Sequence, residues 1–304
     1  MRPAHTGLAV LVTALWGVNF VVIDVGLAHV PPLLFCALRF AFAALPAVFL
    51  VGRPCVRWRW VVAVGLALGV GKFGLLFIGM NQGMPAGLSS LVLQAQAVFT
   101  ALIAFAFLGE RPGRVRALGM VVAVAGIVVA AVDEGGSGPL AAFALVVVAA
   151  AFWGVSNVLT RKAAPGRAFN FMVWSSAVPV LPLLGLSLLF EGPAREGRAL
   201  AGLDVQGVSA ILFVALVATL FGFGTWSHLL RRYDASTVAP YSLLVPVFGM
   251  TSSAVLLGEQ VSASRWCAGV LLVGGVALTS TGGLKRRATA SAAAASNPLL
   301  TQPR

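Results

Sequence analysis

Two short stretches, Trp16-Gly17-Val18 and Leu108-Gly109-Glu110, return in the second half of the chain as Trp153-Gly154-Val155 and Leu257-Gly258-Glu259. Each copy stands at the matching place within its own set of apolar segments. We count five such segments in each half, and an odd number makes the two halves cross a membrane in opposite directions. The pattern therefore predicts two inverted repeats, an architecture typical of transporters.

The composition indicates an integral membrane protein. Hydrophobic residues make up 59% and charged residues 10% of the 304 residues, which leaves too little polar surface to cover a soluble globule. A membrane-spanning helix needs about 20 apolar residues, so we predict an all-α membrane protein with ten transmembrane helices. The spans are expected at 7–27, 32–51, 60–81, 86–108, 115–132, 139–160, 169–190, 205–230, 235–257 and 264–284.

The spans divide the chain into two repeats and a tail. Residues 1–138 form the first five-helix repeat, and residues 139–287 form the second, inverted one. A short Gly-rich connector joins them, so the halves are expected to pack as one bundle. Residues 288–304 are rich in Ala, Ser and Thr without an apolar face, and we predict a disordered cytoplasmic tail.

The distribution of basic residues predicts the orientation. With the N-terminus inside, 16 of the 21 Lys and Arg residues fall in cytoplasmic loops or at the termini, as the positive-inside rule requires. Both termini are therefore expected in the cytoplasm. The net charge of +12 is spread evenly over short loops, so we expect no nucleic-acid partner.

Catalysis, metal binding and cofactors are not indicated. Cys36, Cys55 and Cys267 lack metal-ligand spacing. A membrane enzyme would need a nucleophile, a metal cluster or a carboxylate pair at membrane depth, and the sequence offers none of these. It also contains no ATP-binding domain, which leaves ion or substrate gradients as the source of energy.

Longer motifs carry a resemblance over nearly the whole chain. The paired Trp-Gly and Leu-Gly-Glu motifs on ten spans resemble the EamA-type branch of the drug/metabolite transporter superfamily. The stretches beginning at Trp16, Pro31, Gly83 and Val238 are most similar to the O-acetylserine/cysteine exporter subgroup. This resemblance implies a multi-pass exporter of amino acids or related metabolites in the bacterial inner membrane, driven by the proton gradient. An exporter of another drug or metabolite class, or a lipid-carrier flippase, is the alternative.

Charged residues within the first five spans are the first site candidates, because charge is costly in hydrocarbon and should face a cavity or a partner. Arg39 is our choice for the substrate carboxylate, against a structural pairing with Asp24 or backbone. Lys72 could contact substrate, carry a coupling proton or pair with Asp24. Asp24 lies near the outer end of its helix, where a coupling role and a solvated position are both open.

Neutral and aromatic residues complete the predicted pocket. Asn19 lies about one turn beyond Trp16, and Gln94 and Gln96 lie midway along the fourth span. Because residues two apart on an α-helix point different ways, at most one glutamine should face the cavity, and we favour Gln96. Trp16 and its counterpart Trp153 are expected to shape the pocket, with plain helix packing as the alternative.

The predicted mechanism is alternating access, in which the halves rock around a midplane cavity between spans one, three, four, six, eight and nine. The expected partners are a small-molecule substrate, the lipid bilayer and protons. Monomeric and homodimeric states both remain open.

Overall fold

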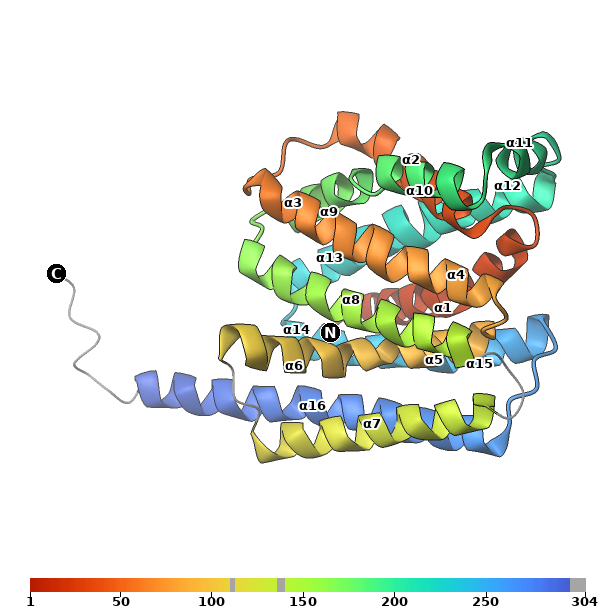
Figure 1. The fold of residues 1–304 in the computed structure, drawn as a ribbon. Coiled ribbons are helices and arrows are strands. Elements are labelled where there is room, and N and C mark those ends of the chain that lie inside the picture. The colour runs from red at the N-terminus through yellow and green to blue at the C-terminus, as the bar shows by residue number, and fades with distance from the viewer. Residues whose placement is uncertain (110–112, 136–139, 296–304) are drawn as a thin grey trace.

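The structure is a computed structural model that describes residues 1–109, 113–135 and 140–295, with the side chains of 134–135, 235–236 and 280–295 outside that description. Every element in these ranges is helical (Figure 1). The first half contains α1 (Pro3–Leu27), α2 (Pro32–Leu50), α3 (Trp58–Gly65), η1 (Leu66–Gly74), α4 (Leu75–Asn81), α5 (Ala86–Val92), η2 (Leu93–Ala95), α6 (Gln96–Leu108) and α7 (Arg114–Gly135).

The second half follows the same general order with two differences: its second span is divided into α9 and α10, and a short helix, α11, follows it. It contains α8 (Leu140–Ala163), α9 (Ala168–Ala177), α10 (Val180–Phe190), α11 (Pro193–Ala201), α12 (Val205–Leu212), η3 (Phe213–Phe221), α13 (Gly222–Arg232), α14 (Ala235–Val238), η4 (Ala239–Leu244), α15 (Val245–Leu256) and α16 (Ala263–Ala295).

The described residues contain nine helical segments that are long and apolar enough to cross a membrane. They match the first nine predicted spans in order. The tenth predicted span corresponds to a shorter apolar stretch, Ala263–Thr279, at the start of α16. The chain is therefore a multi-pass helical membrane protein.

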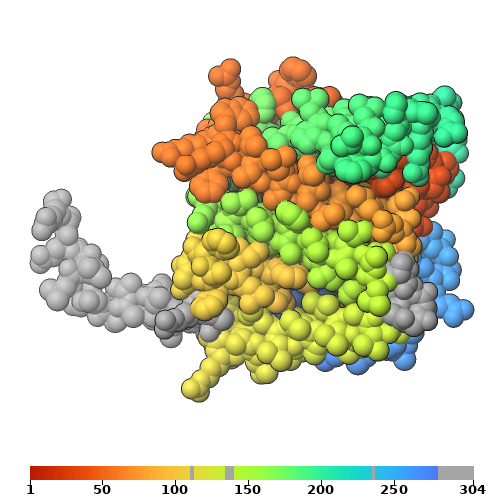
Figure 2. Space-filling view, in the orientation of Figure 1, coloured from red at the N-terminus to blue at the C-terminus, as the bar shows by residue number. Residues whose placement is uncertain are grey.

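The helices of the two halves are interleaved. In the space-filling view, residues of the first half, coloured red to yellow, lie directly beside green and blue residues of the second half (Figure 2). At the bottom of Figure 1, α7 of the first half runs along α16 of the second. Gly126 makes this contact close, because a Cβ there would lie 2.7 Å from the backbone nitrogen of Leu272, and small residues let membrane helices approach in this way.

The repeated Trp-Gly motifs make equivalent contacts between helices. A Cβ on Gly17 of α1 would lie 2.8 Å from the backbone nitrogen of Gly249 in α15. A Cβ on Gly154 of α8 would lie 2.9 Å from the Cβ of Phe99 and from the backbone nitrogen of Thr100 in α6. Both glycines are thus needed for the close approach of a helix that carries a Trp to its neighbour.

Four spans depart from regular α-helix in matching pairs. The third and eighth contain π-helical segments, η1 and η3, and the fourth and ninth contain 3₁₀ segments, η2 and η4. A π segment shifts the direction of the side chains that follow it and is frequent at functional sites. In η1 the backbone also lies close to its neighbours, since a Cβ on Gly71 would lie 2.5 Å from the ring of Phe152.

Two glutamates tie the halves together at the end of the bundle where α11 lies, on the right in Figure 1. Glu259 accepts hydrogen bonds from the backbone N–H groups of Ala86 (2.7 Å) and Gly87 (3.2 Å) at the start of α5. Glu191 accepts from Leu33 (2.7 Å) and Leu34 (3.1 Å) at the start of α2. Carboxylates satisfy the free N–H groups of a helix N-terminus and complement its dipole.

Two aspartates make the same kind of link between halves. Asp133 of α7 accepts from Arg265 Nε (2.9 Å) and from the hydroxyls of Ser262 and Ser264 before and within α16. Asp204 lies 3.3 Å from the Nε2 atom of His29, and its hydrogen bond from the Gly207 N–H, helped by His29, lowers the pKa of this carboxyl. We call these four carboxylates the clasp.

The C-terminal helix runs further than the apolar sequence. It continues to Ala295, so part of the predicted tail 288–304 is helical and projects beyond the bundle (Figure 1). Residues 296–304 lie outside the description, as do Glu110 of the Leu-Gly-Glu motif and residues 136–139 of the connector.

We expect Gly154→Ala to destabilise the protein, because the new methyl group would overlap Phe99 and Thr100 and overpacking costs about 1–3 kcal/mol. Gly185→Ala is the matched control, since a Cβ there meets no atom within 4 Å. The measurement is the melting temperature of the protein purified in detergent. Equal melting temperatures for the two variants would show that the Trp-Gly motif does not depend on close packing.

We expect Glu259→Ala to lower the melting temperature, because two backbone N–H groups at the start of α5 lose a charged acceptor. Hydrogen bonds to charged groups contribute about 1.5–3 kcal/mol. Glu259→Gln keeps one carbonyl acceptor and should fall between wild type and the alanine variant. If the alanine variant melts like wild type, the Glu259 link does not stabilise the bundle.

Candidate functional site

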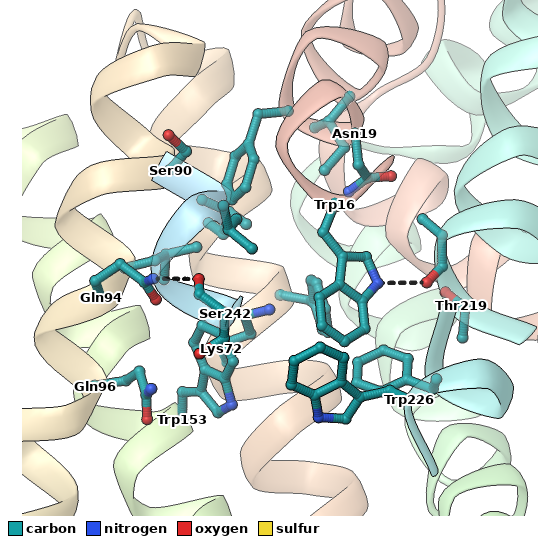
Figure 3. Close-up of a pocket in the computed structure, with 18 of the residues that line it drawn as sticks. Trp16, Asn19, Lys72, Ser90, Gln94, Gln96, Trp153, Thr219, Trp226 and Ser242 are labelled. Carbon is teal, nitrogen blue, oxygen red and sulfur yellow. Dashed lines mark hydrogen bonds between the residues drawn. The ribbon is translucent and has the colours of Figure 1, made fainter. Parts of the chain in front are cut away.

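A cavity of about 280 Å³ lies in the interior of the bundle. It is bounded by all six spans predicted to line it, and the second span adds Arg39. The lining residues are Trp16, Asn19, Phe20, Ile23, Arg39, Lys72, Phe73, Leu76, Ser90, Leu93, Gln94, Gln96, Trp153, Asn157, Ala218, Thr219, Phe223, Trp226, Ala239, Ser242 and Val245. All six residues predicted to bind substrate are in this set. Figure 3 labels Trp16, Asn19, Lys72, Gln96 and Trp153 among them.

Arg39 reaches the cavity from α2 and is only 2% exposed. Its NH2 nitrogen donates a 2.7 Å hydrogen bond to the hydroxyl of Thr219 in η3. Its Nε and NH1 nitrogens are buried, and the residues that the structure describes offer them no hydrogen-bond partner. A buried donor without a partner is costly, so the guanidinium retains unused capacity to bind an anion.

Lys72 enters from the π-helical segment of the third span and is 6% exposed. Its amine lies 3.3 Å from the centre of the Phe73 ring and 4.3 Å from that of Trp153. Within the described part of the chain, no hydrogen bond or ion pair to Lys72 is found. Aromatic faces therefore stabilise this cation where a carboxylate would be expected.

The two cations share one ring. The guanidinium carbon of Arg39 lies 3.9 Å from the centre of Phe73, the same ring that the Lys72 amine contacts. No Asp or Glu is present among the described residues that line the cavity. The described lining thus contains two basic side chains and no acidic one, a composition that favours an anionic group over a cationic one.

Aromatic side chains form the opposite part of the lining. The Trp16 ring lies 5.1 Å from Phe223 and 5.2 Å from Trp226, and Figure 3 shows Trp16 and Trp226 facing the side that carries Lys72 and Trp153. The Trp16 Nε1 atom donates to the backbone oxygen of Ala218 at 2.9 Å. With its N–H satisfied, Trp16 presents an apolar ring to the cavity.

Both glutamines of the fourth span line the cavity, so the prediction that at most one would do so is wrong. That prediction assumed regular α-helix, whereas Gln94 lies in the 3₁₀ segment η2 and Gln96 begins α6. Gln94 donates to the backbone oxygen of Ser242 at 3.1 Å, and Gln96 accepts from Asn157 at 2.6 Å. Each glutamine is therefore held by a different span.

Asp24 does not line the cavity, and within the described residues no ion pair joins it to Lys72. It is half-buried near the clasp, where the carboxylate of Glu259 lies close enough to repel its own. Of the two residues predicted as coupling candidates, Lys72 alone lies at the cavity.

Several lining residues that the sequence analysis did not single out contact predicted site residues directly. Thr219 holds Arg39, Asn157 holds Gln96, and Trp226 packs on Trp16. Asn157 follows Trp153-Gly154 much as Asn19 follows Trp16-Gly17, so the repeat itself contained a signal for it. Thr219 takes the same place in η3 that Lys72 takes in η1, which only the π-helical geometry reveals. We find no group of three or more candidate metal ligands among the described residues.

Known proteins resemble this chain over nearly its full length. A probable amino-acid metabolite efflux pump of Salmonella typhimurium is 43% identical over 92% of this chain and 96% of its own length. A protein of the same description from Escherichia coli is 38% identical over 88% and 92%. A probable terminal-alkyne amino-acid exporter of Streptantibioticus cattleyicolor is 28% identical over 93% and 95%.

A crystal structure with 21% sequence identity superposes with a TM-score of 0.62, covering 91% of this chain and 96% of the other. This likeness concerns the fold. The model of the EamA-like transporter family matches twice, at residues 6–132 and again at residues 140–281. The chain belongs to the EamA-like transporter family.

Proposed function

We propose that this protein exports amino-acid metabolites from the cytoplasm as a secondary active transporter without enzymatic activity. The observation that carries the proposal is the cavity between the two halves, with Arg39 and Lys72 in its wall. A carboxylate is common to amino acids and most of their derivatives, and a guanidinium binds it with paired hydrogen bonds. The names of two relatives as amino-acid metabolite efflux pumps support the same substrate class.

The proposal includes ten transmembrane helices in two inverted repeats, with both termini in the cytoplasm of a bacterial cell and the clasp on the outer side. The two family matches, the paired π and 3₁₀ segments and the paired glycine contacts support the repeats. Arg-rich segments follow α2 and end α8 and α13, at the end of the bundle opposite α11 (Figure 1), which supports the orientation.

Alternating access follows from this arrangement. The clasp joins the halves at one end of the bundle, so a cavity that opens to that side requires these contacts to break. Rocking of one half against the other around a fixed site is the general solution for repeat-based transporters. Lys72 is the coupling candidate at the cavity, and proton coupling through it remains a prediction.

The first experiment measures flux from proteoliposomes loaded with labelled O-acetylserine or cysteine, with and without an imposed pH gradient. Flux above that of empty liposomes supports export of this class, and acceleration by the gradient supports proton coupling. If folded protein moves neither solute nor any other amino-acid derivative, the proposal fails and drug or lipid-carrier transport becomes the better reading.

We expect Arg39→Gln to lower substrate flux about tenfold or more, because the substrate carboxylate loses a charged partner and each 1.4 kcal/mol is a factor of ten. Arg59→Gln is the matched control, since Arg59 is exposed and contacts Trp60 outside the cavity. Both variants are compared at equal membrane abundance. Equal flux in the two variants would remove Arg39 from the substrate site.

A further inference from the structure

We propose that the cavity prefers net-anionic derivatives, in which the carboxylate is free and the amino nitrogen is acylated or absent, over amino-acid zwitterions. The inference rests on the proposed function and narrows its substrate class. It starts from a mismatch: a zwitterion needs a cation for its carboxylate and an acceptor of negative charge for its ammonium group. The described lining of the cavity offers two basic side chains, Arg39 and Lys72, for a carboxylate and no acidic side chain for an ammonium group.

The carboxylate side of the site is built in duplicate. Arg39 offers two buried donors that have no partner in the described part of the chain, and the amine of Lys72 lies against the same Phe73 ring. Two like charges in the protein interior repel each other, and an anion that lies near both offsets the energetic cost. No acidic side chain among the described lining residues supplies that anion. A bound substrate carboxylate would compensate both cations at once.

An ammonium group has no equivalent place. It would enter the same cavity as two cations and would find no carboxylate among the described lining residues. Aromatic faces can hold an ammonium group, but the rings of Phe73 and Trp153 already contact Arg39 and Lys72. The rings of Trp16, Phe223 and Trp226 remain, and a neutral ring compensates an ammonium charge less than a carboxylate does. The Arg39 guanidinium, together with the Lys72 amine whenever it is protonated, therefore opposes a zwitterion more than a simple anion.

An acylated nitrogen suits the remaining lining better. It carries no charge and donates a single N–H, for which Asn19 offers a buried carbonyl oxygen without a hydrogen-bond partner among the described residues. The alkyl part of its acyl group is apolar and matches the rings of Trp16, Phe223 and Trp226. A neutral amide is recognised by neutral amides, and the glutamines of the fourth span add two more.

An isomeric pair of substrates tests the inference directly. N-acetyl-L-serine and O-acetyl-L-serine contain the same atoms in the same numbers, yet the first is a net anion and the second a zwitterion. Efflux of each labelled compound is measured from proteoliposomes at mildly acidic pH, where the ammonium group of O-acetyl-L-serine stays protonated and does not attack its own ester. We expect N-acetyl-L-serine to leave about tenfold faster at equal concentration, and to raise the melting temperature of detergent-purified protein more than its isomer.

Variants of Lys72 test whether the positive charge of this side chain, as distinct from the shape of the cavity, produces the preference for N-acetyl-L-serine. Lys72→Gln should reduce the efflux of N-acetyl-L-serine and the rise in melting temperature that this compound causes. It should also lower the ratio of N-acetyl-L-serine efflux to O-acetyl-L-serine efflux. Lys72→Arg keeps the charge and should keep the preference. Arg59→Gln, which removes a positive charge outside the cavity, should leave it unchanged.

The results that would overturn the preference for anions differ from those that would overturn the proposed export function. If O-acetyl-L-serine moves as fast as its isomer or faster, the preference for anions is overturned while amino-acid metabolite export stands. If Lys72→Gln retains the full preference and the thermal stabilisation, the assignment of Lys72 is overturned. If neither isomer moves or stabilises folded protein, and cysteine does not move either, the proposed function itself fails.

Discussion

A charged side chain in the hydrocarbon region is tolerated only where protein or a water-filled space surrounds it, and this constraint organises the molecule. Arg39 and Lys72 lie at membrane depth on different spans, and both reach the same cavity around the ring of Phe73. Bringing them there requires the second, third and eighth spans to meet, because Thr219 of the eighth span holds Arg39. The cavity is therefore the place where the cost of burying charge is reduced.

Irregular helix segments serve the same requirement. A break in the α-helical pattern frees backbone groups, which a membrane protein accepts only against other protein or water. The π segments of the third and eighth spans carry Lys72 and Thr219, and the 3₁₀ segments of the fourth and ninth carry Gln94 and Ser242. All four of these residues line the cavity, so the irregularities are concentrated where polar groups gather.

Polar contacts are distributed differently at the clasp. There the carboxylates of Glu191 and Glu259 satisfy free N–H groups at helix N-termini of the other half, and Asp133 binds Arg265 across α7 and α16. These links are directional and few, whereas glycine-mediated packing joins the helices along their length. The contacts between the halves are thus of two kinds: a few polar links at one end, and close helix packing along the length.

The order of residues along the chain was enough to predict a helical membrane protein, nine of its spans and the six residues that meet at the cavity. Hydropathy depends on composition over about 20 residues, and buried charge is rare enough in membranes to mark a site on its own. The contacts that these residues make in the cavity depended on how the helices pack. The sequence did not predict that Gln94 and Gln96 would both face the cavity, because a 3₁₀ turn changes side-chain direction without a distinct residue pattern. Nor did it separate Asp24 from Lys72 or bring Thr219 to Arg39, since contacts between distant segments arise only when the helices pack together.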